Sequence, residues 1–253
     1  MSTSSDLRAA AERWAAADPD AATAKTTRAW LAAGDSASLS ACFLERLQFG
    51  TAGLRGTLGP GPNRMNRALV RYATAGLADY LIATVPDALS RGVVVGHDAR
   101  HGSVEFSAEA VAVLRGAGFR VLTTRPHSPT PLVAFAVLEH QAAAGIVVTA
   151  SHNPPEYNGY KVYWENGAQI IPPHDHGIAA AIDAVIETGR SIPLGEGSVD
   201  LGEAIEDAYL AALKKQGARL RLAINAPSVT VVYTPLHGVG AALCERALAA
   251  EGA

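Results

Sequence analysis

The spacing of apolar residues changes along the chain and separates a helical N-terminal part from the rest. Over residues 1–48, apolar side chains recur every three to four positions, as along Leu7, Trp14 and Ala17, and this spacing predicts helices. The pair Asp18-Pro19 and the residue Gly34 mark helix ends. The expected helices span residues 7–17, 21–33 and 38–48.

From residue 66 onward, short apolar runs alternate with amphipathic stretches. The predicted strands are 93–95, 119–123, 145–149 and 160–164, and the predicted helices are 66–85, 103–117, 130–140 and 174–188. Strands and helices that alternate in this way indicate βαβ units. We therefore predict an α/β fold with a mixed, mostly parallel sheet that is sandwiched by helices.

The C-terminal part predicts a linker at 189–200, a helix at 201–216, a strand at 229–234 and a helix from Val239. The segment Gly238-Val239-Gly240 imitates part of a dinucleotide-binding fingerprint, but Leu243 occupies the third glycine position. A tight turn between a strand and a helix is the better interpretation.

Composition excludes several classes of protein. Hydrophobic residues make up 49% of the 253 residues and charged residues 18%, enough to bury a sizeable core, and the net charge of −3 gives no footprint for nucleic acid or an anionic membrane. Two cysteines, Cys42 and Cys244, are expected as reduced thiols rather than as a disulfide scaffold. With no signal peptide and no apolar run of about 18 residues, a soluble cytoplasmic protein is expected.

Two polar loops carry the candidate chemistry. The first, FGTAGLRGTLGPGPNR at 49–64, holds five glycines and two prolines and is expected to lack regular structure. The second, TASHNPPEYNGYK at 149–161, follows an apolar strand, and ligands bind at the carboxyl ends of strands in open α/β sheets. Its Asn153-Pro154-Pro155 run predicts a rigid exposed turn, and Asn158-Gly159 predicts another.

The second loop presents Ser151 beside His152 and brings Lys161 back toward them. This group suits a serine nucleophile with a nearby base, or a phosphorylated serine with cationic partners. An ordinary turn with a capping serine and a solvated lysine fits the same residues, so all three interpretations stay open. Elsewhere, His174-Asp175-His176 could ligate a metal, but a capped and solvated helix start is the better interpretation.

TASHNP at 149–154 resembles the phosphoserine loop of the α-D-phosphohexomutase superfamily, which includes phosphoglucomutases and phosphomannomutases. Three more segments resemble motifs of that family in the expected order: FGTAGLRG at 49–56, GHDAR at 96–100 and Pro-Thr-Pro at 129–131. In addition, NGYKVYWENGAQIIPPHD at 158–175 is similar to the phosphoglucomutase-2-type branch, which includes phosphopentomutases. The similarity covers about residues 40–240.

The resemblance implies an intramolecular phosphotransferase, an isomerase of carbohydrate metabolism. A phosphoserine at Ser151 would donate its phosphoryl group to a sugar monophosphate. The resulting bisphosphorylated sugar would then return its other phosphoryl group to Ser151. Phosphate would thereby move between C1 and C6 of a hexose phosphate, or C1 and C5 of a pentose phosphate. The resemblance of residues 158–175 favours glucose or pentose phosphates as the expected substrates.

The resemblance also implies roles for individual residues. His152 and Lys161 would supply positive charge and proton transfer, and Arg55 and Thr51 would bind the transferring phosphoryl group. Mg²⁺ would bind partly through the phosphate on Ser151, and a sugar bisphosphate would act as the activator. Asp98 and Arg100 are expected to support the loops as an internal ion pair.

The family has four domains, and the motifs of its later domains are absent from this sequence. We therefore expect an N-terminal helical extension at 1–48 packed on a first domain at 49–200, then a linker helix and the incomplete start of a second domain at 201–253. The remaining Mg²⁺ ligands are expected beyond Ala253, so the chain alone would be inactive without C-terminal domains. The alternative is a non-catalytic remnant of the same fold that binds phosphosugars or a protein partner.

Overall fold

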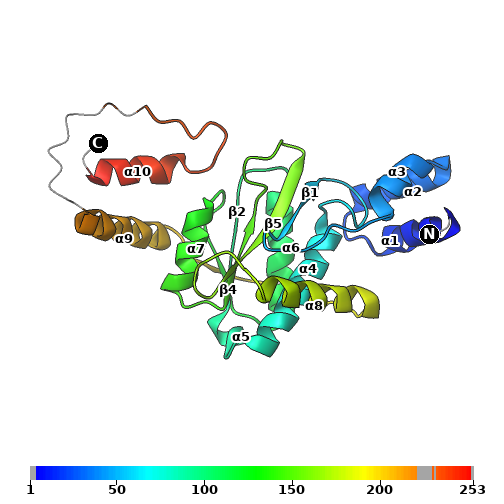
Figure 1. Ribbon diagram of the computed structural model, residues 1–253, viewed down its shortest axis with the longest axis horizontal. Helices are drawn as coiled ribbons and strands as arrows, with labels where there is room; N and C mark the ends of the chain where they lie inside the picture. Colours follow the sequence, from blue (N-terminus) through cyan, green and yellow to red (C-terminus); the bar gives the residue numbers. More distant parts are fainter. Residues whose placement is uncertain (1–3, 221–229, 231, 252–253) are drawn as a thin grey trace.

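The computed structural model describes residues 4–220, 230 and 232–251, and one mixed sheet forms its centre (Figure 1). The strands of this sheet are β1 (Leu54–Thr57), β2 (Val93–His97), β3 (Val121–Thr123), β4 (Ala144–Val148), β5 (Tyr157–Trp164) and β6 (Val199–Asp200). Their order across the sheet is β1-β5-β4-β2-β3-β6. β4, β2, β3 and β6 run parallel, while β5 and β1 are antiparallel additions at one side.

Helices cover both faces of the sheet, which confirms the predicted fold class. The helices are α1 (Ser4–Ala17), α2 (Ala21–Ala33), α3 (Ser36–Phe43), α4 (Arg67–Thr84), α5 (Ala88–Arg91), α6 (Ser103–Gly116), α7 (Thr130–Glu139), α8 (His174–Thr188), α9 (Ala204–Leu220) and α10 (Ala241–Glu251). α4, α6 and α8 bury Leu77, Phe106 and Ile178 against one face. α7 and α9 bury Val133 and Ile205 against the other.

Ion pairs to a buried carboxylate link α4 to α6 on one face of the sheet. The Glu109 carboxylate accepts hydrogen bonds from Arg67 at 3.0 Å and from Arg71 at 2.6 Å, and its side chain is only 2% exposed. A buried carboxylate is tolerated only where cations and hydrogen bonds replace its water, and the two arginines provide both. The pair therefore fixes how α6 lies on α4.

The N-terminal helices form a small apolar cluster of their own. Leu31, Leu39 and Phe43 pack together, and the Trp14 ring meets Phe43 edge-on. Trp14 also contacts Tyr72 of α4, with ring centroids 6.2 Å apart, so α1 packs against α4. Figure 1 shows α1–α3 at one end of the molecule and α9 and α10 at the other.

Most predicted helices and central strands are confirmed to within a few residues, and the errors concern short strands, one short helix and the ends of some elements. The 49–64 segment contains β1, and β5 begins at Tyr157, inside a segment that we expected to be a loop. α5 and β6 were not predicted, and α3 ends at Phe43 rather than at residue 48. Strands as short as β1 and β6 depend on pairing with distant residues, which a local pattern does not contain.

The strand predicted at 229–234 is wrong for the residues that the structure describes. Residues 230 and 232–234 have no regular structure, while 229 and 231 lie outside the described residues. The turn lies at Leu236 and His237, just before the predicted Gly238-Val239-Gly240, and is closed by a hydrogen bond from the Gly238 amide to the Pro235 carbonyl at 2.8 Å. The helix after it is present, with α10 beginning at Ala241 rather than at Val239. α10 is joined to α9 through Arg246, which bonds Glu206 at 2.7 Å.

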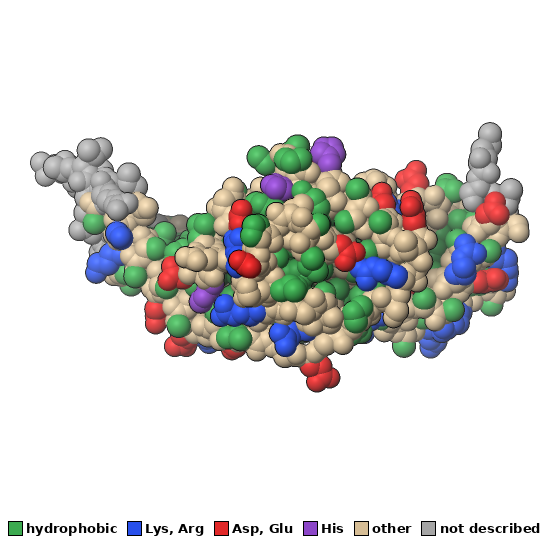
Figure 2. Space-filling view, turned by 90° about the horizontal axis from the view of Figure 1, so that it is seen from below, with side chains coloured by type: hydrophobic (Ala, Val, Ile, Leu, Met, Phe, Trp, Pro, Cys, Tyr) green, Lys and Arg blue, Asp and Glu red, His purple; other side chains and the backbone are tan. Residues whose placement is uncertain are grey.

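The molecular surface mixes charges of both signs. On the face shown in Figure 2, basic and acidic side chains of the described residues are interspersed, with apolar side chains between them. Among the helices that the structure describes, none is long and apolar enough to cross a membrane.

Candidate functional site

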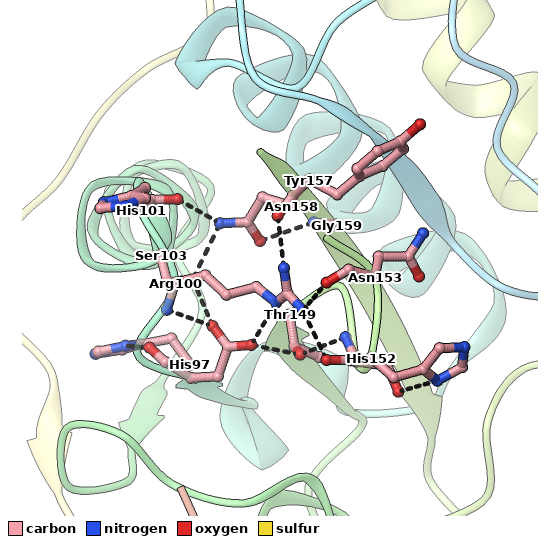
Figure 3. A network of polar contacts seen from close by, with 12 residues as sticks. His97, Arg100, His101, Ser103, Thr149, His152, Asn153, Tyr157, Asn158 and Gly159 are labelled. Atoms are coloured by element: carbon pink, nitrogen blue, oxygen red, sulfur yellow. Dashed lines mark hydrogen bonds and ion pairs between the residues drawn. The ribbon is translucent and has the colours of Figure 1, made fainter. Parts of the chain in front are cut away.

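The Ser151 loop joins β4 to β5 at the carboxyl end of β4 (Figure 3). Ser151 and His152 are exposed, as predicted, and two hydrogen bonds close two successive turns of the loop, the first of which contains them. The Asn153 amide donates to the Ala150 carbonyl at 3.2 Å, and the Tyr157 amide donates to the Pro154 carbonyl at 3.0 Å. The loop is thus a compact turn that presents a hydroxyl and an imidazole to solvent.

Ser151 is held in the left-handed backbone region, with φ at 58°. This conformation costs a residue with a β-carbon about 1–2 kcal/mol, so neighbouring contacts have to maintain it. One such contact comes from Thr149, whose hydroxyl accepts a hydrogen bond from the Ser151 amide at 2.9 Å. The same hydroxyl donates to the Asp98 carboxylate at 2.6 Å. The Ser151 hydroxyl itself lies 3.4 Å from Nδ1 of His152.

The Arg100 side chain lies behind the loop and pairs with Asp98 at 3.3 Å, where each side chain is 15% exposed. This confirms the internal ion pair predicted from the sequence. The guanidinium also donates to four backbone carbonyls of the loop. These belong to Ser151 (2.7 Å), Asn153 (2.6 Å), Pro154 (2.8 Å) and Tyr157 (3.1 Å).

The start of α6 is joined to the same network (Figure 3). The Ser103 hydroxyl donates to Asp98 at 2.7 Å and accepts from the Asn158 amide group at 3.0 Å. Asn158 also donates to the His101 carbonyl at 2.9 Å and is fully buried. Asn158-Gly159 was predicted as a turn, which is wrong: both residues lie inside β5, where Asn158 satisfies buried polar groups and Gly159 admits neighbouring carbonyls.

β1 brings the Gly-rich loop alongside the Ser151 loop. Arg55 lies opposite Gly159 in β5, and its guanidinium donates to the Asn153 side chain at 3.1 Å. Thr51 lies in the exposed turn before β1, and its carbonyl accepts a hydrogen bond from Gln169 at 2.8 Å. The hydrogen bonds of the described residues thus join Arg55, but not Thr51, to the Ser151 loop.

Lys161 lies in β5 opposite Val147 of β4. Burial lowers the pKa of its ammonium group and the nearby Arg55 cation lowers it further, while the Asp98 carboxylate acts in the opposite direction. The Asp98 carboxylate therefore offsets part of the repulsion between the two cations, although it is also paired with Arg100. A phosphoryl group bound here would add further negative charge.

A preformed metal site is not found among the described residues, which hold no group of three or more His, Cys, Asp or Glu suited to a metal ion. At the start of α8, His174 stacks on Trp164 with ring centroids 3.9 Å apart and lies 3.2 Å from the Tyr80 hydroxyl. It is therefore packed in an aromatic cluster rather than solvated. His176 is exposed, and its amide donates to the Asp175 carboxylate at 2.9 Å.

A cavity of about 450 Å³ lies beside α6 and includes His97, Val104 and Thr123 in its lining. None of the candidate residues Ser151, His152, Lys161 or Arg55 lines it. The candidate site is instead an open surface at the edge of the sheet.

The structure thus brings together Ser151, His152, Asn153, Arg55 and, through its electrostatic interaction with Arg55, Lys161. Sequence analysis did not assign roles to Thr149, Ser103, Asn153 or Asn158 as supports of the loop. Thr149 and Asn153 lie within the TASHNP segment, which was a usable signal. Ser103 and Asn158 are separated by 55 positions, and no local pattern links them.

Comparisons with known proteins show which proteins this chain resembles. Residues 46–188 match the family model described as phosphoglucomutase/phosphomannomutase, alpha/beta/alpha domain I. The chain is 40% identical over 247 residues to a probable phosphoribomutase of Schizosaccharomyces pombe, covering 96% of the chain and 42% of that protein. It is 36% identical over 253 residues to a human phosphopentomutase, covering 94% and 41%.

A solved structure from Burkholderia thailandensis, a phosphoglucomutase/phosphomannomutase family protein, superposes with a TM-score of 0.60. It is 26% identical and the match covers 81% of this chain and 42% of that one. The chain therefore spans about two fifths of the length of the relatives that it matches.

Proposed function

Because the chain belongs to the phosphoglucomutase/phosphomannomutase family, we propose that it supplies the phosphoryl-carrying part of a phosphosugar mutase. The observation that carries the proposal is an exposed serine, Ser151, held in a fixed conformation beside cationic side chains at the carboxyl end of β4. Such a serine can be approached by a sugar on one side while its loop remains anchored on the other.

The reaction would proceed by transfer from and back to Ser151. In the first step the bond between phosphorus and Oγ of Ser151 breaks, and a bond forms between phosphorus and a sugar hydroxyl oxygen. The sugar hydroxyl proton passes to a neighbouring base and Oγ of Ser151 takes up a proton as it leaves; His152 and Lys161 are the candidates for these transfers. In the second step, Oγ of Ser151 gives up that proton and bonds to the other phosphorus of the bisphosphorylated sugar. The bond from that phosphorus to the sugar oxygen breaks and the sugar oxygen is protonated, which regenerates the phosphoserine.

Arg55 and Lys161 would stabilise the phosphoryl group in transfer, because phosphoryl transfer depends chiefly on positioning and on charge stabilisation. The lowered pKa of Lys161, caused first by burial and then by the Arg55 cation, supports this role, since an incoming anion would offset both effects. Thr51, in the turn before β1, would join them only after a movement of that turn, or through its contact with substrate.

Mg²⁺ would bind an oxygen of the phosphate on Ser151, a hard oxygen donor of the kind that it prefers. It would supply further neutralisation of the transferring phosphoryl group. Mg²⁺ takes about six ligands and commonly keeps several waters, so one phosphate oxygen is compatible with ligands from substrate, solvent and other carboxylates. A sugar bisphosphate would act as the activator because it can phosphorylate an empty Ser151.

We propose pentose phosphates as the preferred substrates, with phosphate moving between C1 and C5. The names of the S. pombe and human relatives, a probable phosphoribomutase and a phosphopentomutase, support this choice over hexose phosphates. We also propose the division expected from the sequence: a helical extension at 1–48, the phosphoserine domain at 49–200 and a connecting helix with a following unit at 201–253. The family match to 46–188 supports the central part.

The test is a mutase assay on the protein purified from its own cells, with ribose 1-phosphate and glucose 1-phosphate offered separately. We expect conversion of ribose 1-phosphate to the 5-phosphate, with a lower kcat/KM for glucose 1-phosphate. Ser151→Ala should abolish both conversions, whereas Ser90→Ala, at an exposed serine far from the loop, should leave them unchanged. Because the chain alone is expected to be inactive, the result that would contradict the proposal is conversion of neither sugar by the unaltered protein in the form that its own cells make.

A further inference from the structure

The geometry points to Arg100 as the residue that positions Ser151 for phosphoryl transfer without itself binding phosphate. This inference rests on the proposed function, because it concerns the same serine. That Arg100 holds the backbone of the loop can also be tested without measuring activity.

The hydrogen-bond donors of the Arg100 guanidinium are directed at the loop. A guanidinium group has five N–H donors, and Arg100 has five acceptors around it. Four are the loop carbonyls of Ser151, Asn153, Pro154 and Tyr157, which accept from Nη1 and Nη2, and the fifth is the Asp98 carboxylate, which forms an ion pair with Nε at 3.3 Å. With all four Nη hydrogens bonded to the loop, no Nη donor remains for a phosphate group or a sugar.

The contacts of Arg100 extend over the whole Ser151 loop. They reach from Ser151 to Tyr157, so a single planar group fixes the course of the backbone over the whole turn. The Ser151 carbonyl is one of the acceptors, and the Ser151 amide is held by Thr149, which is itself bonded to Asp98. The peptide groups at Ser151 are thereby held by the same ion pair from both sides.

Ser151 adopts a left-handed backbone conformation that its neighbours have to maintain. A positive φ is costly for serine, and the contacts of Arg100 and Thr149 offset that cost. The anchor is firm because Asp98 also accepts from the Ser103 hydroxyl and from the Arg100 amide at 3.0 Å. The position of the reactive hydroxyl is therefore set from the start of α6, and not only by the strands that flank the loop.

The variant Arg100→Lys tests the inference, because lysine keeps the positive charge next to Asp98 but cannot span four carbonyls. Arg91→Lys is the matched control. Arg91 also donates to two carbonyls, of Gln141 (2.9 Å) and Ala142 (3.3 Å), and pairs with the carboxylate of Glu165 (2.8 Å). It lies at the amino ends of β2 and β4, whereas the Ser151 loop lies at the carboxyl end of β4. The two substitutions thus remove the same kind of contact in different places.

Amide hydrogen exchange is the first measurement, and it does not depend on catalysis. In Arg100→Lys, we expect the amides of Ser151, Asn153 and Tyr157 to exchange at least about tenfold faster, while those of β4 keep their protection. Arg91→Lys should leave the loop amides unchanged. If the loop amides of Arg100→Lys exchange as in the unaltered protein, or if β4 loses protection equally, the inference is wrong.

Mutase kinetics provide the second measurement. We expect Arg100→Lys to lower kcat by about 10- to 100-fold with KM within about twofold, as a displaced reactive group does. A raised KM at unchanged kcat would show instead that Arg100 binds substrate. If the unaltered protein shows no mutase activity, the proposed function fails while hydrogen exchange still decides the role of Arg100.

Thr149→Val provides a second variant in case Arg100→Lys does not fold. It cuts the link from Asp98 to the Ser151 amide and leaves Arg100 in place. We expect faster exchange at Ser151 alone and a lowered kcat. Full protection of the Ser151 amide in this variant would overturn the inference.

Discussion

A β-carbon on Gly53 would lie 1.9 Å from the carbonyl oxygen of Tyr160, because Gly53 directly precedes Leu54, which pairs with Tyr160 of β5. Gly53 also has a φ of +73°, which a residue with a side chain rarely adopts. The close approach brings Arg55, two positions later, to the Ser151 loop.

We therefore predict that Gly53→Ala lowers the free energy of unfolding by about 2–4 kcal/mol, the sum of backbone strain and steric overlap. Urea unfolding measures the change. Gly50→Ala is the control from the same loop, since a β-carbon there meets nothing within 4 Å, and it should change stability by about 0.5 kcal/mol or less. Equal effects of the two substitutions would contradict the close contact between β1 and β5.

The backbone of Ser151 predicts an unusual order of stabilities among its variants. Because φ is 58°, glycine should relieve strain that alanine retains. Ser151→Gly should be more stable than Ser151→Ala by about 1 kcal/mol, although glycine normally loses more entropy on folding. Thermal unfolding of the two variants checks this, and a more stable alanine variant would mean that the left-handed conformation is absent in solution.

We predict that the ammonium group of Lys161 lowers the stability of the fold, although it would serve phosphoryl transfer. Its lowered pKa means that the folded state binds fewer protons than the unfolded state at pH values between that lowered pKa and the ordinary 10.5. Stability should therefore rise with pH across this window. Lys161→Met, which keeps the apolar stem, should remove this pH dependence and raise Tm at pH 7 by roughly 2–4 °C.

Inorganic phosphate provides a control for the Lys161 prediction. It should raise the Tm of the unaltered protein by binding beside Arg55 and Lys161, and it should raise that of Lys161→Met less. A lower Tm for Lys161→Met at pH 7 would show that the ammonium group stabilises the empty site, contrary to this prediction.

The buried Glu109 carboxylate makes a prediction about the contact between α4 and α6. Glu109→Ala leaves Arg67 and Arg71 without their partner and should cost about 3–5 kcal/mol. Asp79→Ala breaks a pair with Arg190 whose side chains are 48% and 39% exposed, so it should cost at most about 1 kcal/mol. Guanidinium unfolding of both variants measures the difference, and similar losses would rule out a special role for the buried pair.

The elements that the sequence predicted well carry their signals locally. α2 was predicted at its observed bounds because the Asp20 side chain accepts a hydrogen bond from the Ala22 amide and Gly34 ends the helix in the left-handed conformation. β1 and β6 were missed because each is short and is defined by a partner strand many residues away.

The same distinction applies to the candidate site. Ser151, His152 and Arg55 stand in recognisable motifs, and the ion pair of Asp98 with Arg100 was anticipated from one of them. The four carbonyl acceptors of Arg100 were not predictable, because backbone groups leave no trace in the sequence. The burial of Asn158 was hidden by an Asn-Gly pair that usually marks a turn.

The most direct test of the central proposal is the phosphorylation state of Ser151 in the protein isolated from its own cells. Peptide mass spectrometry should find phosphate on Ser151, and addition of ribose 5-phosphate should discharge it while ribose 1,5-bisphosphate forms. A Ser151 that is unphosphorylated throughout, or a phosphate on Ser151 that no sugar phosphate removes, would contradict the role of this serine as the phosphoryl carrier.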